Sequence, residues 1–113
     1  MKMIVAFFHP RRLERVTRAL EHVPGFSGMT VTEGRGFGRE KLQVRPRDHL
    51  AELTDFTDTI RVEIVTSATL VDALMNAITE AARTGQRDDG KVFVLPVERG
   101  RRIRTGEEGE VVV

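Results

Sequence analysis

Two strand-like segments, each leading into a helical pattern, constrain the fold of this 113-residue chain more than any other feature. The first segment is the apolar run over residues 3–8, typical of a strand covered on both faces. His9-Pro10 ends it, because proline has no N–H for a strand ladder but suits the first turn of a helix. The helical pattern that follows consists of Leu13, Val16, Leu20 and Val23. Pro24-Gly25 predicts its end.

The second strand–helix unit lies in the second half of the chain. Residues 60–64 alternate between apolar and polar side chains, which predicts a strand. The helical pattern after it consists of Leu70, Leu74, Ile78 and Ala81. Thr84-Gly85 predicts the end of this helix. Two further strands are expected, one at Met29–Thr32 and one at Lys91–Val97, and the tail from Arg99 is polar and charged.

The resulting order, β-α-β-β-α-β, predicts an α+β fold, the ferredoxin-like plait, as a single domain over residues 1–113. The link between the second and third strands is about twenty residues long, whereas hairpin loops usually have about two to five. Long loops in small domains are usually functional or disordered. We therefore expect this loop to have a function.

The composition excludes several classes of protein. A net charge of +1 argues against nucleic-acid binding, which needs a concentrated positive field. The absence of Cys excludes disulfides and thiolate metal sites, and no apolar run approaches the ~20 residues that cross a bilayer. We expect a cytoplasmic domain. No catalytic residues are predicted, because His9, His22 and His49 have no partners at the spacing of a metal site or catalytic base.

Three clusters could bind an anion. The segment 34–39 combines three glycines with two arginines, which suits phosphate but also a bulged strand end. The turn over residues 84–91 ends in Lys91, although its glycines are also ordinary turn residues. Residues 99–104 contain four arginines followed by acidic residues, which fits either a small anion such as a nucleotide phosphate or a solvated basic tail.

The clusters and their order resemble the nitrogen-regulatory P-II signal-transduction family over nearly the whole chain. The blocks that carry the resemblance are Gly28–Glu33, Gly36–Arg39, Val62–Val65, Thr84-Gly85, Asp89–Lys91 and Ile103–Glu107. The resemblance implies a homotrimer that binds ATP or ADP in clefts between subunits. It also implies a T-loop at about 37–58, a B-loop at about 84–91 and a C-terminal loop at about 99–113. The T-loop would control a membrane channel or transporter, or a metabolic enzyme, without insertion into the membrane.

The resemblance also assigns nucleotide-binding residues. These are Thr30, Gly36, Gly38, Arg39, Val65, Gly90, Lys91, Arg102 and Arg104. Thr30 and Val65 would lie along the adenine and ribose. The glycines would allow the backbone to approach, and the charged side chains would hold the phosphates, with the tail arginines supplied by the adjacent subunit.

Three positions and the absence of one residue type depart from the family pattern. Glu40 stands where the family usually has Gln, and Thr59 stands where the family has Lys. In the family, that Gln and that Lys both contact 2-oxoglutarate. Glu40 could still ligate magnesium, but its charge would repel a dicarboxylate, so we expect weak or absent 2-oxoglutarate binding. Asp88 replaces Gly in the B-loop, where its charge would disfavour additional phosphates. The chain has no Tyr, so the tyrosine modified in many relatives cannot exist here.

Two functions follow from the resemblance. The first is control of nitrogen metabolism by adenine nucleotides. The alternative is regulation of a transporter outside nitrogen metabolism, for inorganic carbon or metal efflux, without a 2-oxoglutarate response. An ATP hydrolase is the third reading, and the sequence offers it no evident base or water-positioning group.

Overall fold

The computed structural model describes residues 1–37 and 56–113, so the expectations for Gly38, Arg39 and Glu40 lie outside the described residues. Its helices and strands, in chain order, are β1 (Lys2–Phe8), α1 (Leu13–Glu21), β2 (Thr30–Gly36), β3 (Thr57–Thr66), α4 (Val71–Ala82) and β4 (Gly90–Pro96). Short 3₁₀ turns precede α1 (Pro10–Arg12) and α4 (Ala68–Leu70), and a third lies near the end of the chain (Glu110–Val112). The predicted α+β order is confirmed.

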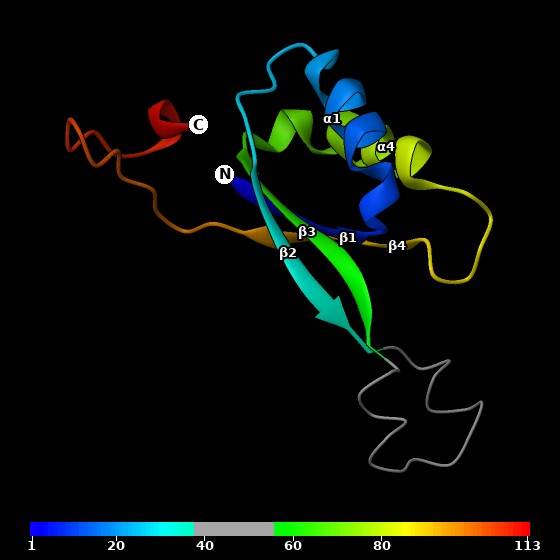
Figure 1. The fold of residues 1–113 in the computed structure, drawn as a ribbon. Coiled ribbons are helices and arrows are strands. Elements are labelled where there is room, and N and C mark those ends of the chain that lie inside the picture. Colours follow the sequence, from blue (N-terminus) through cyan, green and yellow to red (C-terminus); the bar gives the residue numbers. More distant parts are fainter. Residues whose placement is uncertain (38–55) are drawn as a thin grey trace.

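The four strands form one antiparallel sheet in the order β2-β3-β1-β4 (Figure 1). Strand β3 lies between β1 and β2, and β1 lies between β3 and β4, so each helix connects two strands that have a third between them. This is the topology of the ferredoxin-like plait. The apolar composition of β1 follows from burial of its side chains, since Ile4, Val5, Ala6 and Phe8 are all buried.

Both helices cover one face of the sheet and pack against each other (Figure 1). The inward-facing residues of β1 and β3 meet the buried stripes of α1 and α4 in a single core. The largest fully buried side chains are Ile4, Leu20, Ile64, Leu74, Ile78, Val16 and Val62. Most of these belong to the two periodic patterns in the sequence, so burial of those stripes holds the fold together.

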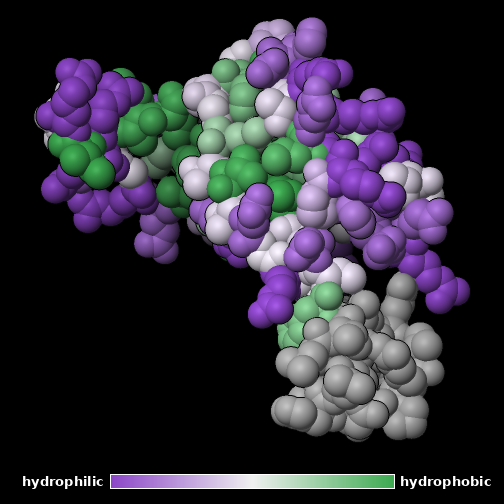
Figure 2. Space-filling view, viewed as in Figure 1, coloured by the Kyte–Doolittle hydropathy of each residue, from purple (hydrophilic) through white to green (hydrophobic). Residues whose placement is uncertain are grey.

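No helix of the described residues covers the opposite face of the sheet. Residues that pair directly across antiparallel strands point to the same face, so Val65, Met3 and Leu95 form one outward row. Phe93 and Leu95 on this face are 49% and 40% exposed. Figure 2, in which the molecule is seen with β2 in front and the helices above it, also shows a hydrophobic area in the middle of the visible surface, flanked by hydrophilic residues. An outward sheet face with large apolar side chains is typical of an interaction surface.

Strands β2 and β3 continue beyond the end of β1 as a two-stranded ribbon. Strand β1 stops at Phe8, opposite Ile60, whereas three further β2–β3 pairs follow, ending with Gly36 opposite Thr57. Gly34 and Gly36 therefore lie inside a regular strand instead of in a bulge, and β3 begins at Thr57, earlier than its apolar alternation indicates. At the end of the ribbon the rings of Phe37 and Phe56 are 5.4 Å apart between centroids.

Within the described residues, no helix combines the length and the apolar character that a membrane span requires.

Candidate functional site

A single carboxylate organises the turn between α4 and β4. Asp89 accepts hydrogen bonds from the backbone N–H groups of Thr84 (2.7 Å) and Gly85 (2.8 Å), and also from the Thr84 hydroxyl. These bonds stabilise the ionised form and lower the pKa of Asp89 below its ordinary value of 3.8, the Thr84 side chain being the largest cause. The turn is therefore closed before any ligand binds.

The same turn brings the backbone of Gly90 against β1. Gly90 has a φ of +124°, and a Cβ added there would lie 1.9 Å from the carbonyl oxygen of Phe7. Only glycine fits this close approach, which leads directly into the first pairs of β4. Lys91 follows, opposite Phe7, and its side chain is exposed. The turn thus places an ammonium group at the edge of the sheet.

An open pocket of about 350 Å³ lies beside this turn, between α4 and the start of β4. Gly90 and Lys91 line it together with Asp89, Phe7 and Met75. It includes none of the other predicted nucleotide-binding residues that the structure describes.

On the outward face of the sheet, charged and aromatic side chains adjoin Lys91. The Arg61 guanidinium lies over the Phe7 ring, 5.4 Å from its centroid, and its Nε donates to Glu63 (3.0 Å). Phe7 is edge-on to Phe93 at 6.4 Å. Arg61, on β3, is thus held in place by a ring and a carboxylate, with β1 between it and the strand that carries Lys91.

Val65 lies toward the other end of the sheet, and Thr30 lies near its middle. Val65 pairs with Met3, whereas Thr30 pairs with Glu63, which is itself opposite Val5, and both residues are exposed on the outward face. Because Lys91 is opposite Phe7, it is separated along the strands by about 13 Å from Val65 and by about 7 Å from Thr30. A nucleotide bound by one chain alone would have to bridge these distances across the sheet.

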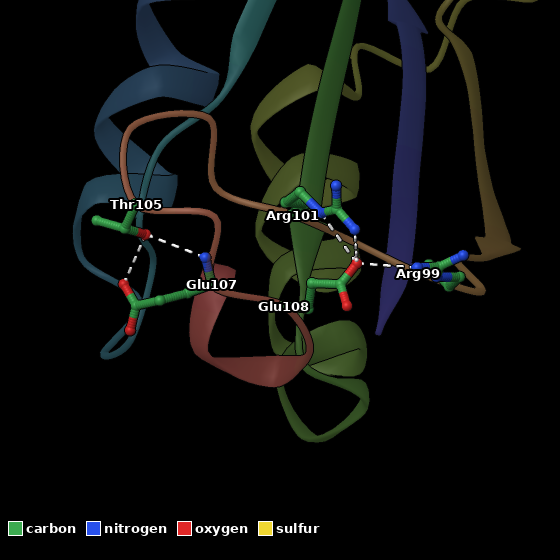
Figure 3. A network of polar contacts seen from close by, with 5 residues as sticks. All are labelled: Arg99, Arg101, Thr105, Glu107 and Glu108. Carbon is green, nitrogen blue, oxygen red and sulfur yellow. Dashed lines mark hydrogen bonds and ion pairs between the residues drawn. The ribbon is translucent and has the colours of Figure 1, made fainter.

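The tail after β4 folds back on itself. Residues 101 and 108 form a β-bridge, and the backbone N–H of Arg102 donates to the carbonyl of Glu107 (2.8 Å). Arg99 and Arg101 both donate to one oxygen of Glu108, at 2.9 Å and 2.7 Å (Figure 3). The sequence predicted only a polar, charged tail here, because this arrangement depends on pairing across the hairpin, which leaves no periodic pattern.

The two predicted tail ligands differ in their surroundings. Arg102 is half-buried, and its guanidinium donates to Glu107 (3.0 Å) and to the carbonyl oxygen of Val111 (2.8 Å). Arg104 is exposed and makes no hydrogen bond or ion pair in the part of the chain that the structure describes. One arginine is therefore tied within the hairpin, and the other is open to solvent.

The predicted residues thus fall into two groups within one chain. Gly36 on the ribbon lies at the same end of the sheet as Gly90 and Lys91. Val65 lies toward the other end, where the tail leaves the sheet after Pro96, opposite Lys2, and Thr30 lies between the two ends, level with Val5. The topology therefore does not bring the two groups together.

Two side chains with evident roles were not among the predicted site residues. Asp89 shapes the turn, although the sequence indicated only an ordinary Asp-Gly turn, and Glu107 holds Arg102. The sequence does contain a signal for the role of Asp89. Asp side chains often accept hydrogen bonds from nearby backbone N–H groups, and Thr84-Gly85, which ends the helix, lies only five and four residues before Asp89. For Glu107, the corresponding feature of the sequence is that an acidic residue follows the arginine cluster closely enough to pair with an arginine across a turn.

Comparison with known proteins shows the family. The chain matches the family described as Nitrogen regulatory protein P-II over residues 1–107. It is 46% identical over 110 residues to the Nitrogen regulatory protein P-II of Haemophilus influenzae, with 97% of each chain covered. It is 42% identical over 113 residues to the Nitrogen regulatory protein P-II 1 of Escherichia coli, with 100% of each covered.

The chain belongs to the nitrogen regulatory protein P-II family. The resemblance seen in the sequence is confirmed, and so is its fold. A P-II protein from Azospirillum brasilense is similar to the same extent, at 44% identity over 109 residues with 96% of each chain covered. These relatives are named as regulatory proteins. Among the described residues of this P-II protein, no three His, Asp or Glu side chains are grouped to hold a metal ion.

Proposed function

We propose that this P-II protein is a signal-transduction regulator in nitrogen metabolism. It binds ATP or ADP in clefts between neighbouring subunits of a homotrimer. It controls a partner protein in the cytoplasm through the T-loop, which connects β2 and β3. It acts by binding and does not catalyse a reaction. The B-loop is the turn at 84–91, and the C-terminal loop is the tail from about residue 99.

The observation that carries this proposal is the separation of the predicted ligands, with Gly90 and Lys91 at one end of the sheet and Val65 and the tail arginines toward the other. A chain that carries two different halves of a site completes it by presenting one half to the next copy. Contacts between two different surfaces are heterologous, and they close into a ring when the rotation between copies permits. In a trimer, each cleft would take Gly90 and Lys91 from one subunit and Thr30, Val65 and the tail arginines from its neighbour.

The chemistry of both halves suits a nucleotide. Lys91 supplies a point charge, and Arg102 and Arg104 supply planar guanidinium groups that bond phosphate oxygens with two N–H donors. The preformed turn at 84–91 adds backbone close to the ligand without an ordering cost at binding. The exposed edge of Val65 and the hydroxyl of Thr30 would contact the base and the sugar.

Mixed trimers test the shared cleft directly. Lys91→Ala and Arg102→Ala, each alone, should weaken ATP and ADP binding by about tenfold or more, because each removes a charge-assisted bond to phosphate. If the two proteins are denatured and refolded together, about a quarter of the clefts should combine an intact Lys91 with an intact Arg102. Calorimetry of the mixture should then show recovery of tight binding sites in that proportion.

The control is a mixture of wild-type chain with the double variant Lys91→Ala/Arg102→Ala, prepared in the same way. A cleft contained in one chain would give no recovery in the first mixture and half of the sites in the control. Unchanged affinity in both single variants would exclude the assigned site altogether.

The metabolite response of this P-II protein should differ from the family pattern. The hydroxyl of Thr59, in place of the family lysine, donates to the Phe8 carbonyl (3.3 Å), so it offers no charge to a dicarboxylate. With Glu40 nearby in sequence, we expect weak or absent 2-oxoglutarate binding, and any magnesium ligation by Glu40 would leave that repulsion in place. Calorimetry with ATP and magnesium present checks this, and micromolar 2-oxoglutarate affinity would contradict it.

Nitrogen control is favoured over regulation of a carbon or metal transporter because the similar proteins are named nitrogen regulatory proteins. The matches cover nearly the whole length of both chains.

A further inference from the structure

The tail hairpin places an acidic side chain directly across from one of its arginines. The backbone N–H of Arg102 donates to the Glu107 carbonyl (2.8 Å), and the N–H of Gly106 donates to the Arg102 carbonyl (2.8 Å). This closed turn fixes the Glu107 side chain beside the Arg102 guanidinium, whose Nη1 donates to Oε1 at 3.0 Å. The contact therefore follows from the hairpin itself.

A hydroxyl group holds the Glu107 carboxylate in that position. The Thr105 Oγ1 donates to the same Oε1 (2.9 Å) and accepts the backbone N–H of Glu107 (3.2 Å) (Figure 3). The other terminal nitrogen of Arg102 donates to the Val111 carbonyl (2.8 Å). Both terminal nitrogens of Arg102 are therefore occupied by oxygen acceptors of the same chain.

A carboxylate on a guanidinium uses the same donors that a phosphate would use. The Arg102 and Glu107 side chains are 40% and 46% exposed, so their ion pair is weak enough to be displaced. Glu107 also carries a negative charge that would repel phosphate oxygens at the same spot. Arg104, in contrast, is open to an incoming anion without displacement of a partner.

We propose that Glu107 is an internal anion that competes with the nucleotide phosphates for Arg102 and so lowers the affinity of this P-II protein for its ligand. The proposal rests on the proposed function. Binding then requires that Arg102 leaves Glu107, and Glu107 sets how much ligand is needed.

Neutralisation of one carboxylate tests the competition. Glu107→Gln keeps an oxygen for Thr105 and Arg102 but removes the charge. By calorimetry it should bind both ATP and inorganic tripolyphosphate about threefold to tenfold more tightly than wild type. The gain should shrink at high salt, because the pair is exposed. Equal or weaker binding by Glu107→Gln would overturn the proposal, and weaker binding would show that Glu107 positions Arg102 for the ligand.

Glu108→Gln is the matched control. It neutralises the adjacent acid on the same hairpin, but Glu108 contacts Arg99 and Arg101 and not Arg102. Its affinity should stay within about twofold of wild type, and an equal gain would mean that net charge alone is responsible. In an Arg102→Ala background, Glu107→Gln should give a much smaller gain, because the competition acts through Arg102 and only the direct repulsion of phosphate by Glu107 remains. A full gain in that background would overturn the proposal.

The two ligands separate this proposal from the proposed function. Tighter tripolyphosphate binding in Glu107→Gln, with no ATP binding by any variant, would support the competition and refute nucleotide binding. ATP binding that depends on Arg102 but not on Glu107 would support the function and refute the competition. No binding of either ligand by any variant would refute both.

Discussion

At the scale of single residues, the approach of Gly90 to β1 sets a strict steric limit. Gly90→Ala should lower the free energy of unfolding by about 2–4 kcal/mol, because the new Cβ meets the Phe7 carbonyl and the φ of +124° is strained for any other residue. Urea unfolding measures this change.

Gly85→Ala is the comparison for that variant. Gly85 also has a positive φ, +91°, but a Cβ there would meet nothing within 4 Å. Only backbone strain is expected, about 1–2 kcal/mol. Equal losses at the two positions would contradict a specific contact between Gly90 and β1.

Asp89 should make the free energy of unfolding depend on pH in the acidic range. Its pKa is lowered in the folded chain, so its contribution to stability is complete above 3.8 and is lost as the pH falls from there through the lowered pKa. The difference in free energy of unfolding between wild type and Asp89→Asn should therefore be largest near neutral pH and shrink below about pH 4. The free energy of unfolding measured across this pH range checks the prediction, and Asp88→Asn, a change at the neighbouring acid, is the control. A difference that grows toward acid would contradict the lowered pKa.

Residue types indicate candidate ligands more readily than the side chains that support them. Lys91 and the tail arginines stand out in the sequence because a phosphate needs their charges. Asp89 and Glu107 do not, because their roles depend on which N–H or guanidinium the folded turn brings near them. Such supports become visible only when the backbone is placed.

At the scale of elements, one arginine joins the two strand–helix units. Arg12, just before α1, donates from Nε to the carbonyl of Ala81 (3.1 Å) and from Nη2 to that of Arg83 (3.4 Å), at the C-terminal end of α4. Carbonyls at a helix C-terminus lack partners in their own helix and favour a cation. Arg12→Met, which keeps the apolar stem, should cost about 1 kcal/mol of stability.

Arg11→Met is the matched change one position earlier, at an exposed side chain that makes no hydrogen bond or ion pair among the described residues. It should alter the free energy of unfolding by less than about 0.5 kcal/mol. Thermal or urea unfolding of both variants measures the two changes in stability. Equal effects would contradict a stabilising hydrogen bond from Arg12 to the end of α4.

The helices were predictable because their periodic stripes are local in sequence. Leu74 and Ile78 mark α4 without any knowledge of what covers them. The ends of the strands were less predictable, since Gly34 and Gly36 count as strand only because Thr59 and Thr57 lie opposite. The tail hairpin escaped prediction for the same reason.

At the scale of the whole molecule, the outward face of the sheet should hold subunits together. Leu95→Glu places a charge among apolar residues on that face, which costs free energy only if the face is covered. Light scattering should give about three times 12.7 kDa for wild type and a smaller mass for the variant. A trimer that persists in Leu95→Glu would contradict the use of this face, and a monomeric wild type would refute the trimer.

Ala73→Glu, on the exposed side of α4, is the control and should not change the mass. Composition and periodicity could not predict which surface takes part in assembly, because exposed apolar residues such as Phe93 look like core residues in a sequence. Only the sheet register shows that Phe93 and Leu95 point away from the helices.

The ribbon formed by the ends of β2 and β3 has a mechanical consequence. Its last three pairs extend about 10 Å past β1, and no third strand pairs with them among the described residues. Two-stranded ribbons twist more strongly than wider sheets. This sheet is therefore deformed most easily at one end. A small change of twist near Thr59 gives a larger displacement at the far end of the ribbon, while the rest of the sheet stays stiff.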